Sequence, residues 1–306
     1  MRRGFRFVLL WTVVLSALTM GGTVVGEQTP SCTITVQPGE SIQAAIDSTP
    51  AGGVICLADG RWEENLTIDK SLTLVGCGSD RSSVVGRKRG VPVLRVDSAV
   101  PISVTVANLG VLDARGGPQE CVSVYPQQAQ TICPDGVAIM GYAAVILRGV
   151  RGTGCGRMGV YATDYSSATL RDCFISGSGR IGLFVRRYAA GTAENTYITA
   201  NNEGAMVADS AFMTLQSCEI TNSASYGLYV GGQPICELRS CKIARNGNNG
   251  IALADKPHLT LISTSVTENL GWGILRLTYP VPYQAVLSID TSSDLAGNQL
   301  GEIGTR

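Results

Sequence analysis

The segment Gly182-Leu183-Phe184-Val185 recurs with conservative changes along the second half of the chain. Each copy opens with a glycine, and successive glycines are separated by 23, 23, 22, 23, 23 and 23 residues. The glycines are Gly136, Gly159, Gly182, Gly204, Gly227, Gly250 and Gly273. A period kept over this many copies indicates a repeat architecture, in which each repeat stacks on the next.

Apolar residues inside each repeat predict short strands. With the glycine counted as position 0, aliphatic or small residues fill positions 1 and 3, then 9 and 11, then 14 and 16. A spacing of two places side chains on one face of a strand, which is not the periodicity of a helix. Three strands per repeat describe one coil of a parallel β-helix. A leucine-rich repeat has a similar period, but it fits worse because no amphipathic helix with several leucines fits inside a repeat.

Position 19 of the repeat is polar in five successive copies. Its occupants are Ser178, Asn201, Ser223, Asn246 and Asn269. Side chains at one position stack along the solenoid axis, so we expect a polar ladder that satisfies backbone groups of a turn.

The region before the regular repeats carries a family resemblance. Residues 36–46 read VQPGESIQAAI, residues 53–62 read GVICLADGRW, and the short runs 66–68 and 72–76 follow. This order resembles the N-terminal coil of right-handed parallel β-helix proteins of the pectin-lyase-like superfamily, including the periplasmic NosD-like group. The resemblance covers nearly the whole chain after the amino terminus and implies an all-β, right-handed parallel β-helix solenoid. It implies little about activity, because the superfamily contains lyases, hydrolases, esterases, phage tailspikes and members without assigned chemistry.

A short helix is expected at the start of the solenoid. Ser41 is a suitable N-cap, and Ile42, Ala45 and Ile46 share one helical face. Such a helix would cover the open amino-terminal end of the core, which otherwise exposes an apolar cross-section and an unpaired strand edge.

The amino terminus has the order of a signal peptide. Arg2, Arg3 and Arg6 precede an apolar run, and small residues follow at Gly21, Gly22 and Gly26. We therefore divide the chain into a signal peptide, 1–26, and a single β-helix domain, 27–306. Within that domain we expect irregular coils over 33–135, regular coils over 136–277, and a closing coil and tail over 278–306.

This division predicts an exported protein that is secreted, periplasmic or held at the cell surface. Retention of the signal as a membrane anchor is the alternative; after its removal no apolar run long enough to span a bilayer remains. The whole chain has 24 basic and 24 acidic residues, and without the signal 21 basic residues face 24 acidic ones. Such a balance argues against a nucleic-acid partner. We expect a monomer.

Ten cysteines in an exported chain suggest disulfides. Cys121 and Cys133 are bridge candidates because they flank the loop 122–132, and two of Cys32, Cys56 and Cys77 supply a second candidate bridge. Cys218 and Cys241 occupy position 14 of neighbouring repeats, about 4.8 Å apart along the stack. A bridge needs closer β-carbons, so we expect these two to be free thiols in the core.

Outward positions 5 and 6 hold the candidate functional residues. Position 5 carries Asp164, Arg187, Asp209 and Asp255, and position 6 carries Tyr165 and Tyr188. Such a face suits a glycan, because aromatic rings stack on sugars and charged groups bind hydroxyls or uronate carboxylates. In related lyases an arginine acts as base near calcium-binding acidic residues, and in related esterases two aspartates work with an arginine. The alternative is a solvated charge ladder that relieves repulsion between stacked aspartates.

Other signatures point away from particular chemistries. The sequence has no CxxC pair and one histidine, His258, so we expect no metal site and no cofactor, except calcium if the chain is a lyase.

Two hypotheses about the function remain. One is a non-catalytic β-helix that binds polysaccharide or a cell-surface glycan, or serves as an envelope scaffold. The other is a polysaccharide lyase or hydrolase acting on a uronate-containing polymer.

Overall fold

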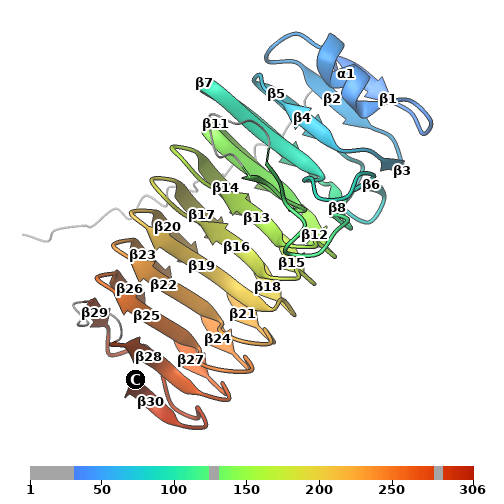
Figure 1. The fold of residues 1–306 in the computed structure, drawn as a ribbon. Coiled ribbons are helices and arrows are strands. Elements are labelled where there is room, and N and C mark those ends of the chain that lie inside the picture. Colours follow the sequence, from blue (N-terminus) through green and yellow to red (C-terminus); the bar gives the residue numbers. More distant parts are fainter. Residues whose placement is uncertain (1–30, 124–130, 279–284) are drawn as a thin grey trace, which may run out of the picture. The chain divides into compact units, whose positions relative to one another are not determined.

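The computed structural model describes residues 31–123, 131–278 and 285–306. The expected signal peptide, 1–26, lies outside these residues. Ser31–Arg306 is an all-β solenoid of stacked parallel coils, and a single short helix occurs in the part of the chain that the structure describes (Figure 1). The predicted fold class is confirmed.

Three columns of parallel strands run along the axis. The first column contains β4 (Leu66–Ile68), the first parts of β7 (Leu94–Ala107) and β11 (Val137–Arg148), β13 (Met158–Ala162), β16 (Ile181–Val185), β19 (Glu203–Asp209), β22 (Leu228–Gly232), β25 (Ile251–Asp255), β28 (Trp272–Leu277) and β30 (Gly301–Thr305). The second column contains β1 (Ile34–Val36), β2 (Val54–Leu57), β5 (Leu72–Val75), the later parts of β7 and β11, β14 (Ser167–Arg171), β17 (Ala190–Glu194), β20 (Phe212–Gln216), β23 (Ile235–Arg239), β26 (His258–Ile262) and β29 (Val286–Ile289). The third column contains β3 (Gly60–Glu63), β6 (Ser82–Val85), β8 (Gly110–Leu112), β12 (Arg151–Thr153), β15 (Phe174–Ser176), β18 (Tyr197–Thr199), β21 (Glu219–Thr221), β24 (Lys242–Ala244) and β27 (Ser265–Thr267).

Strand register places equivalent repeat positions beside one another. Leu170 pairs with Ala193, which pairs with Leu215 in the next coil, and Ile175 pairs with Ile198 in the third column. Inward side chains from all three columns form one continuous apolar cluster along the axis. The strand periodicity of the sequence therefore predicts the core correctly.

The repeated glycines are close-approach positions. A β-carbon on Gly182 would lie 2.6 Å from the carbonyl oxygen of Gly204 and 2.6 Å from Cγ2 of Ile198. None of the seven repeat glycines has a positive φ. These positions are glycine because the strand start packs against the third column and the next coil, not because the backbone is left-handed.

The polar ladder at position 19 is confirmed at its asparagines, whereas the buried hydroxyls of Ser178 and Ser223 have no hydrogen-bond partner. Asn246 Oδ1 accepts from the backbone N–H of Ser223 at 3.0 Å, and Asn269 Oδ1 accepts from that of Asn246 at 3.1 Å. Asn246 Nδ2 in turn donates to the carbonyl oxygen of Ile220 at 3.3 Å. Each asparagine thus satisfies buried backbone groups of a neighbouring coil, which would be costly to leave unpaired.

The coil bends at three corners, and each contains a left-handed residue. The first corner lies at position 5, the second at position 13 and the third at position 18, as in Asp164 (φ 63), Asp172 (φ 53) and Asn222 (φ 56). Asp, Asn and Gly enter this conformation most readily, and short polar residues and glycine recur at the second corner, whereas the third corner also contains Ala200, Arg245 and Glu268.

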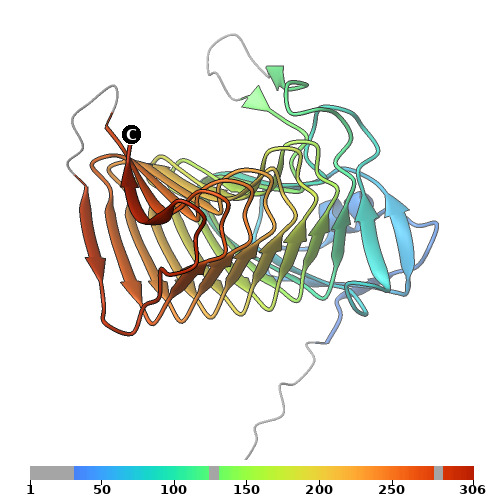
Figure 2. The same cartoon turned by 90° about the horizontal axis from the view of Figure 1, so that it is seen from below.

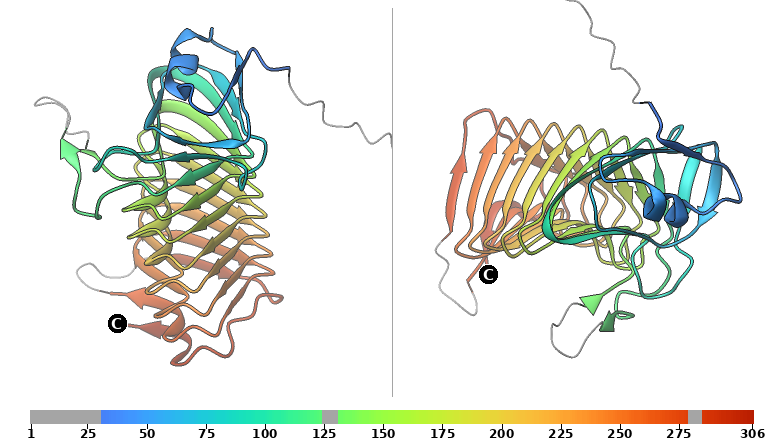
Figure 3. Two further views of the ribbon diagram at one scale, coloured as in Figure 1. Left: turned by 90° about the vertical axis from the view of Figure 1, so that its right-hand side faces the viewer. Right: turned by 90° about the horizontal axis from the view of Figure 1, so that it is seen from above.

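Both ends of the solenoid are covered. Helix α1 (Ile42–Ser48) is capped by Ser41, whose hydroxyl accepts from the N–H of Ala44, and it buries Ile42, Ala45 and Ile46 as predicted (Figure 3). At the other end β29 and β30 add a last turn, and the Trp272 ring lies against Gly301 and Gly304.

An excursion leaves the solenoid between β8 and β11. It contains the antiparallel pair β9 (Val122–Ser123) and β10 (Thr131–Ile132), which projects from the stacked coils (Figure 2). A disulfide joins Cys121 to Cys133 within it, and a second joins Cys32 to Cys56 at the first strands. The other six cysteines are free; Cys77 is exposed, and Cys218 and Cys241 are buried thiols as the strand spacing predicts.

Candidate functional site

The position-5 residues lie at the first corner, between the first and second strand columns. Asp164, Arg187, Asp209 and Asp255 all have left-handed backbones, with φ between 58° and 65°. Each aspartate also accepts a backbone N–H from the preceding coil: Asp164 from Gly141, Asp209 from Arg187 and Asp255 from Gly232, at 3.1 to 3.2 Å. The acidic column therefore stabilises the corner whatever else it does.

Three of the four position-5 side chains are brought together. The Arg187 guanidinium donates to Asp164, and its backbone N–H donates to Asp209. The Asp164 carboxylate raises the pKa of Arg187, which stays charged. Asp255 stands apart, because Gly232 occupies position 5 in the coil between it and Asp209. The alternating charges thus form a compact Asp-Arg-Asp group and a separate aspartate.

A stack of three tyrosines runs beside this group. The rings of Tyr142 and Tyr165 are 5.3 Å apart between centroids, those of Tyr165 and Tyr188 are 5.2 Å apart, and both pairs are nearly parallel. Tyr165 has a neighbouring ring on both faces and therefore presents its edge to solvent, whereas Tyr142 and Tyr188 each stack with a ring on one face only. Tyr142 was not predicted, although it occupies position 6 of the repeat that Gly136 opens.

The outward surface of the first-column strands carries further aromatic residues. Tyr161 and Phe184 are 5.6 Å apart between ring centroids, and Phe184 packs with Met158 and Ile181 in a cluster separate from the main core. Position 2 of the repeat supplies Tyr161, Phe184, Met206 and Tyr229. This pattern at position 2 is visible in the sequence. It does not by itself predict a surface, because apolar residues in a strand are easily assigned to the core when it is unknown which face of the strand points outward.

Two arginines join these rings to carboxylates. Arg157 donates to both oxygens of buried Asp135 at 2.8 Å, and its guanidinium lies 5.0 Å from the Tyr161 ring centroid. Arg186 lies 5.7 Å from the Phe184 ring centroid and donates to Asp209 at 3.0 Å. Arg186 thereby connects the strand surface with the first corner. We call this surface, made of the outward residues of β13, β16, β19 and β22 and the adjoining corner, the first-column face.

A second group on the first-column face contains titratable side chains with perturbed acidity. Burial raises the pKa of Glu203, and the nearby Arg180 opposes this shift. Burial also raises the pKa of Tyr229, with Asp255 and Glu203 adding to the effect. Tyr229 lies flat over Gly231, where a β-carbon would come within 2.5 Å of the ring. A half-buried carboxyl beside a phenol is an arrangement able to exchange protons with a bound molecule.

Neither a metal-binding cluster nor a membrane-spanning helix occurs among the residues that the structure describes. Among residues 31–123, 131–278 and 285–306, no group of three or more His, Cys, Asp and Glu side chains is arranged to hold a metal ion. No helix within the same ranges is long and apolar enough to cross a membrane.

Comparison with known proteins supports the fold. Residues 135–280 match the family model described as "Right handed beta helix region". No curated protein matches the chain in sequence.

Solved structures with the same fold have low sequence identity to the chain. The A-module of the mannuronan C-5 epimerase AlgE4 from Azotobacter vinelandii is 18% identical with a TM-score of 0.55, over 86% of this chain and 92% of that one. Pectate lyase Pel9A is 13% identical with a TM-score of 0.52, over 88% and 78% of the two chains. ORF18 of Geobacillus virus E2 is 13% identical with a TM-score of 0.57, over 86% and 56%. At these identities the likeness shows a shared fold.

Proposed function

Because this chain is a right-handed parallel β-helix repeat protein with the fold of the pectin-lyase-like superfamily, we propose that it is an exported protein that binds polysaccharide without cleaving it. The binding surface is the first-column face. Its role at the cell surface is that of a glycan-holding scaffold.

One observation carries the proposal: the first-column face presents aromatic and charged groups on consecutive coils. On two consecutive coils an arginine lies over an aromatic ring, Arg157 over half-buried Tyr161 and Arg186 over the nearly buried Phe184. Tyr229 follows two coils further on, beyond Met206. Coils follow one another about every 4.8 Å, which is comparable with the repeat of a sugar chain lying along the solenoid. Aromatic groups and planar guanidinium groups then meet successive sugar residues with apolar and hydrogen-bonding contacts.

A binding panel tests this proposal. Acidic and neutral polysaccharides are titrated into the wild-type protein and into Tyr161→Ala and Arg186→Ala, both partly exposed positions. We expect each variant to weaken binding about tenfold. A matched control is Phe212→Ala on the second column, an exposed aromatic residue outside the face. Unchanged affinity in both face variants, with thermal unfolding like the wild type, would reject the first-column face as the binding surface.

The group around Glu203 favours one alternative, a lyase or hydrolase acting on a uronate-containing polysaccharide. Arg180 would pair with a uronate carboxylate, while Glu203 and Tyr229, whose pKa values are raised, would transfer protons at the sugar. The mannuronan epimerase and the pectate lyase with the same fold are named for action on such polymers.

Release of unsaturated or reducing ends, measured with and without calcium, separates the two functions. Binding without any release supports the non-catalytic proposal. Turnover that is lost in Glu203→Gln or in Arg187→Ala would replace it with the enzyme alternative. Wild-type affinity in the inactive variants would show that the lost activity is chemical rather than a loss of binding.

A further inference from the structure

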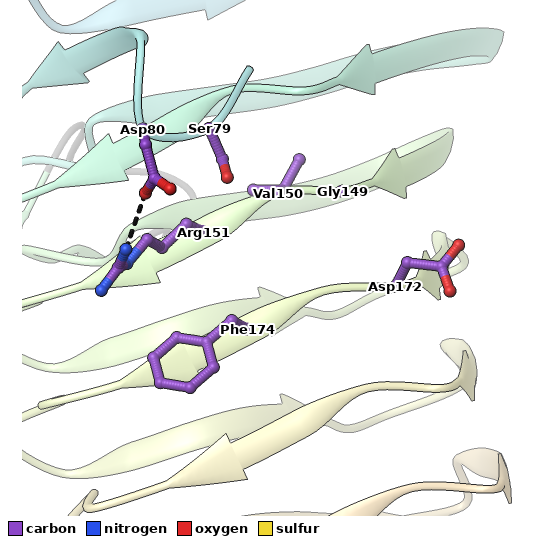
Figure 4. A pocket seen from close by; sticks show the side chains of 7 residues that line it. All are labelled: Ser79, Asp80, Gly149, Val150, Arg151, Asp172 and Phe174. Atoms are coloured by element: carbon purple, nitrogen blue, oxygen red, sulfur yellow. Dashed lines mark hydrogen bonds and ion pairs between the residues drawn. The ribbon is translucent and has the colours of Figure 1, made fainter.

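A second surface, on the third strand column, has the features of a ligand site. Two hollows of about 340 and 390 Å³ lie there, and they share Asp172 and Phe174. The first hollow extends from Asp80 past Arg151 to Phe174 (Figure 4), and the second continues from Phe174 to Tyr197, so together they form one trough along the axis. Arg151, Phe174 and Tyr197 are partners in neighbouring strands, so the trough crosses successive coils at equal spacing.

One end of the trough is closed by a loop. The loop that carries Ser79 and Asp80 passes over Gly110, where a β-carbon would lie 2.8 Å from the Ser79 carbonyl oxygen. The loop can approach this strand only because Gly110 has no side chain. Asp80 then accepts a hydrogen bond from Arg151 at 2.7 Å, across 71 residues of sequence (Figure 4).

The floor of the trough is aromatic. The Arg151 guanidinium lies 5.4 Å from the Phe174 ring centroid and covers it from the preceding coil. Tyr197, in the following coil, is 50% exposed. An aromatic side chain this exposed adds little to the core, so its position in a hollow beside Phe174 favours contact with a ligand.

The side of the trough is a row of polar corner residues. Asp172, Asn195 and Ser217 occupy the left-handed second corner of three consecutive coils. Their side chains offer a carboxylate, an amide and a hydroxyl beside the aromatic floor. The trough also holds two carboxylates, Asp80 and Asp172, against the single cation of Arg151.

We propose that this trough binds a neutral saccharide chain lying along the solenoid axis. The exposed Tyr197 ring contacts the apolar face of a sugar, and the row of acid, amide and hydroxyl groups pairs with hydroxyls of successive residues. The excess of carboxylates in the trough repels a uronate or a sulfate group. We therefore expect the trough to prefer neutral saccharides, unlike a surface that binds an acidic polymer. The site lies on a different strand column from the first-column face and is independent of the function proposed there.

Isothermal titration with neutral hexasaccharides of glucose and of mannose tests this inference, with an oligouronate and heptalysine as charged probes. The variants are Tyr197→Ala, Tyr197→Phe and Asp172→Asn, and the control is Phe212→Ala, an exposed aromatic residue on the second strand column. We expect a neutral hexasaccharide to bind, Tyr197→Ala to weaken it about tenfold, and Tyr197→Phe to retain the affinity. Phe212→Ala is expected to leave this binding unchanged.

Three results would overturn the inference. The first is that neither neutral hexasaccharide binds. The second is that a neutral hexasaccharide binds but Tyr197→Ala and Asp172→Asn leave its affinity unaltered. The third is that heptalysine or the oligouronate binds in place of the neutral probes, and that either variant abolishes this binding. Since Tyr197 is exposed, its replacement is expected to keep the wild-type unfolding midpoint. Loss of acidic-polymer binding in Tyr161→Ala alone concerns the first-column face and leaves the trough untouched.

Discussion

Two different backbone constraints determine the residue type at particular positions of this solenoid. The repeat glycines avoid collision with the next coil, as the contacts of Gly182 with Gly204 and Ile198 show. The corner residues, in contrast, must accept a left-handed backbone, which explains why Asp164 and Asp209 recur at one position. The geometry of the coil therefore explains the residue types at these sites without reference to a ligand.

Replacing a repeat glycine should destabilise the protein strongly. In Gly182→Ala the new β-carbon would lie 2.6 Å from the Gly204 carbonyl oxygen, and backbone cannot move aside cheaply. We expect a loss of about 3 kcal/mol, at the upper end of overpacking effects, measured by chemical denaturation. Gly152→Ala is the control, because its β-carbon would meet only the end of the Ile175 side chain, at 3.1 Å. Equal effects of the two substitutions would contradict this account.

The polar ladder contains a weak step that can be repaired. Ser223 Oγ is buried without a hydrogen-bond partner, whereas asparagine fills the same position at Asn201 and Asn246. In Ser223→Asn the new amide would accept from the Asn201 N–H and donate to the Ile198 carbonyl oxygen. We expect a gain of about 1 kcal/mol, measured as a higher thermal midpoint, and a loss in the reference variant Asn246→Ala. A lower midpoint for Ser223→Asn would mean that this coil has no room for the amide.

Whole elements depend on how the ends of the columns are closed. The closing turn, which joins β29 to β30, has no further coil to pair with, so its loop must satisfy the backbone of the preceding coil. Asp290 does this by accepting from the Ser263 N–H at 3.1 Å, while Ser293 donates its hydroxyl to the same carboxylate at 2.7 Å. The carboxyl-terminal end is thus held by polar contacts in addition to apolar packing.

The closing turn should weaken in acid because of Asp290. Hydrogen bonds from Ser292 and Ser293 lower its pKa to about 2, from the ordinary 3.8. A depressed folded-state pKa stabilises the fold at pH values above the unfolded pKa, and this contribution is lost as the pH falls from about 4 toward 2. The difference in unfolding midpoint between wild type and Asp290→Asn should therefore be largest at pH 5 and shrink toward pH 2. A difference that stays constant over this range would show that the carboxylate charge is not what holds the turn.

At the scale of the whole molecule, the solenoid is a linear array in which each coil contacts its neighbours. Disulfides occur only outside the regular coils, at the first strands and in the excursion, whereas thiols occupy the regular core. The regular coils are thus held by non-covalent contacts without a disulfide, and the reactivity of their buried thiols should report how readily they open.

Thiol labelling measures that opening. All six free cysteines except Cys77 are buried, and burial raises the pKa of Cys155 and Cys236 to about 12. We expect one thiol to react rapidly in the native protein, five more to react on unfolding without reductant, and four more after reduction. Cys77→Ser should remove the fast reaction alone. Rapid native labelling of a second thiol would show that a regular coil opens readily.

Much of this architecture could be predicted from the sequence, because the period places equivalent positions in columns. The strands, the core, the capping helix at Ser41 and the asparagine ladder all follow from spacing. The binding surfaces could not be predicted as fully, because they depend on which residues face outward and on how far loops reach. Asp80 meets Arg151 through a glycine-dependent loop, and Asp135 meets Arg157 only where the excursion returns to the first column. The column that contains Tyr142, Tyr165 and Tyr188 can be found in the sequence, but the parallel stacking of the three rings is known only from the structure.

The third corner is a place where the chain changes length within the regular coils. Five residues normally separate its left-handed residue from the next repeat glycine, as from Gly154 to Gly159, but four separate Ala200 from Gly204 and 23 separate Asp113 from Gly136. The strand columns keep their register through both changes. A foreign loop or small domain spliced between Gly247 and Asn248 should therefore be displayed from the side of the solenoid without disturbing a single strand, which makes this corner a natural graft point.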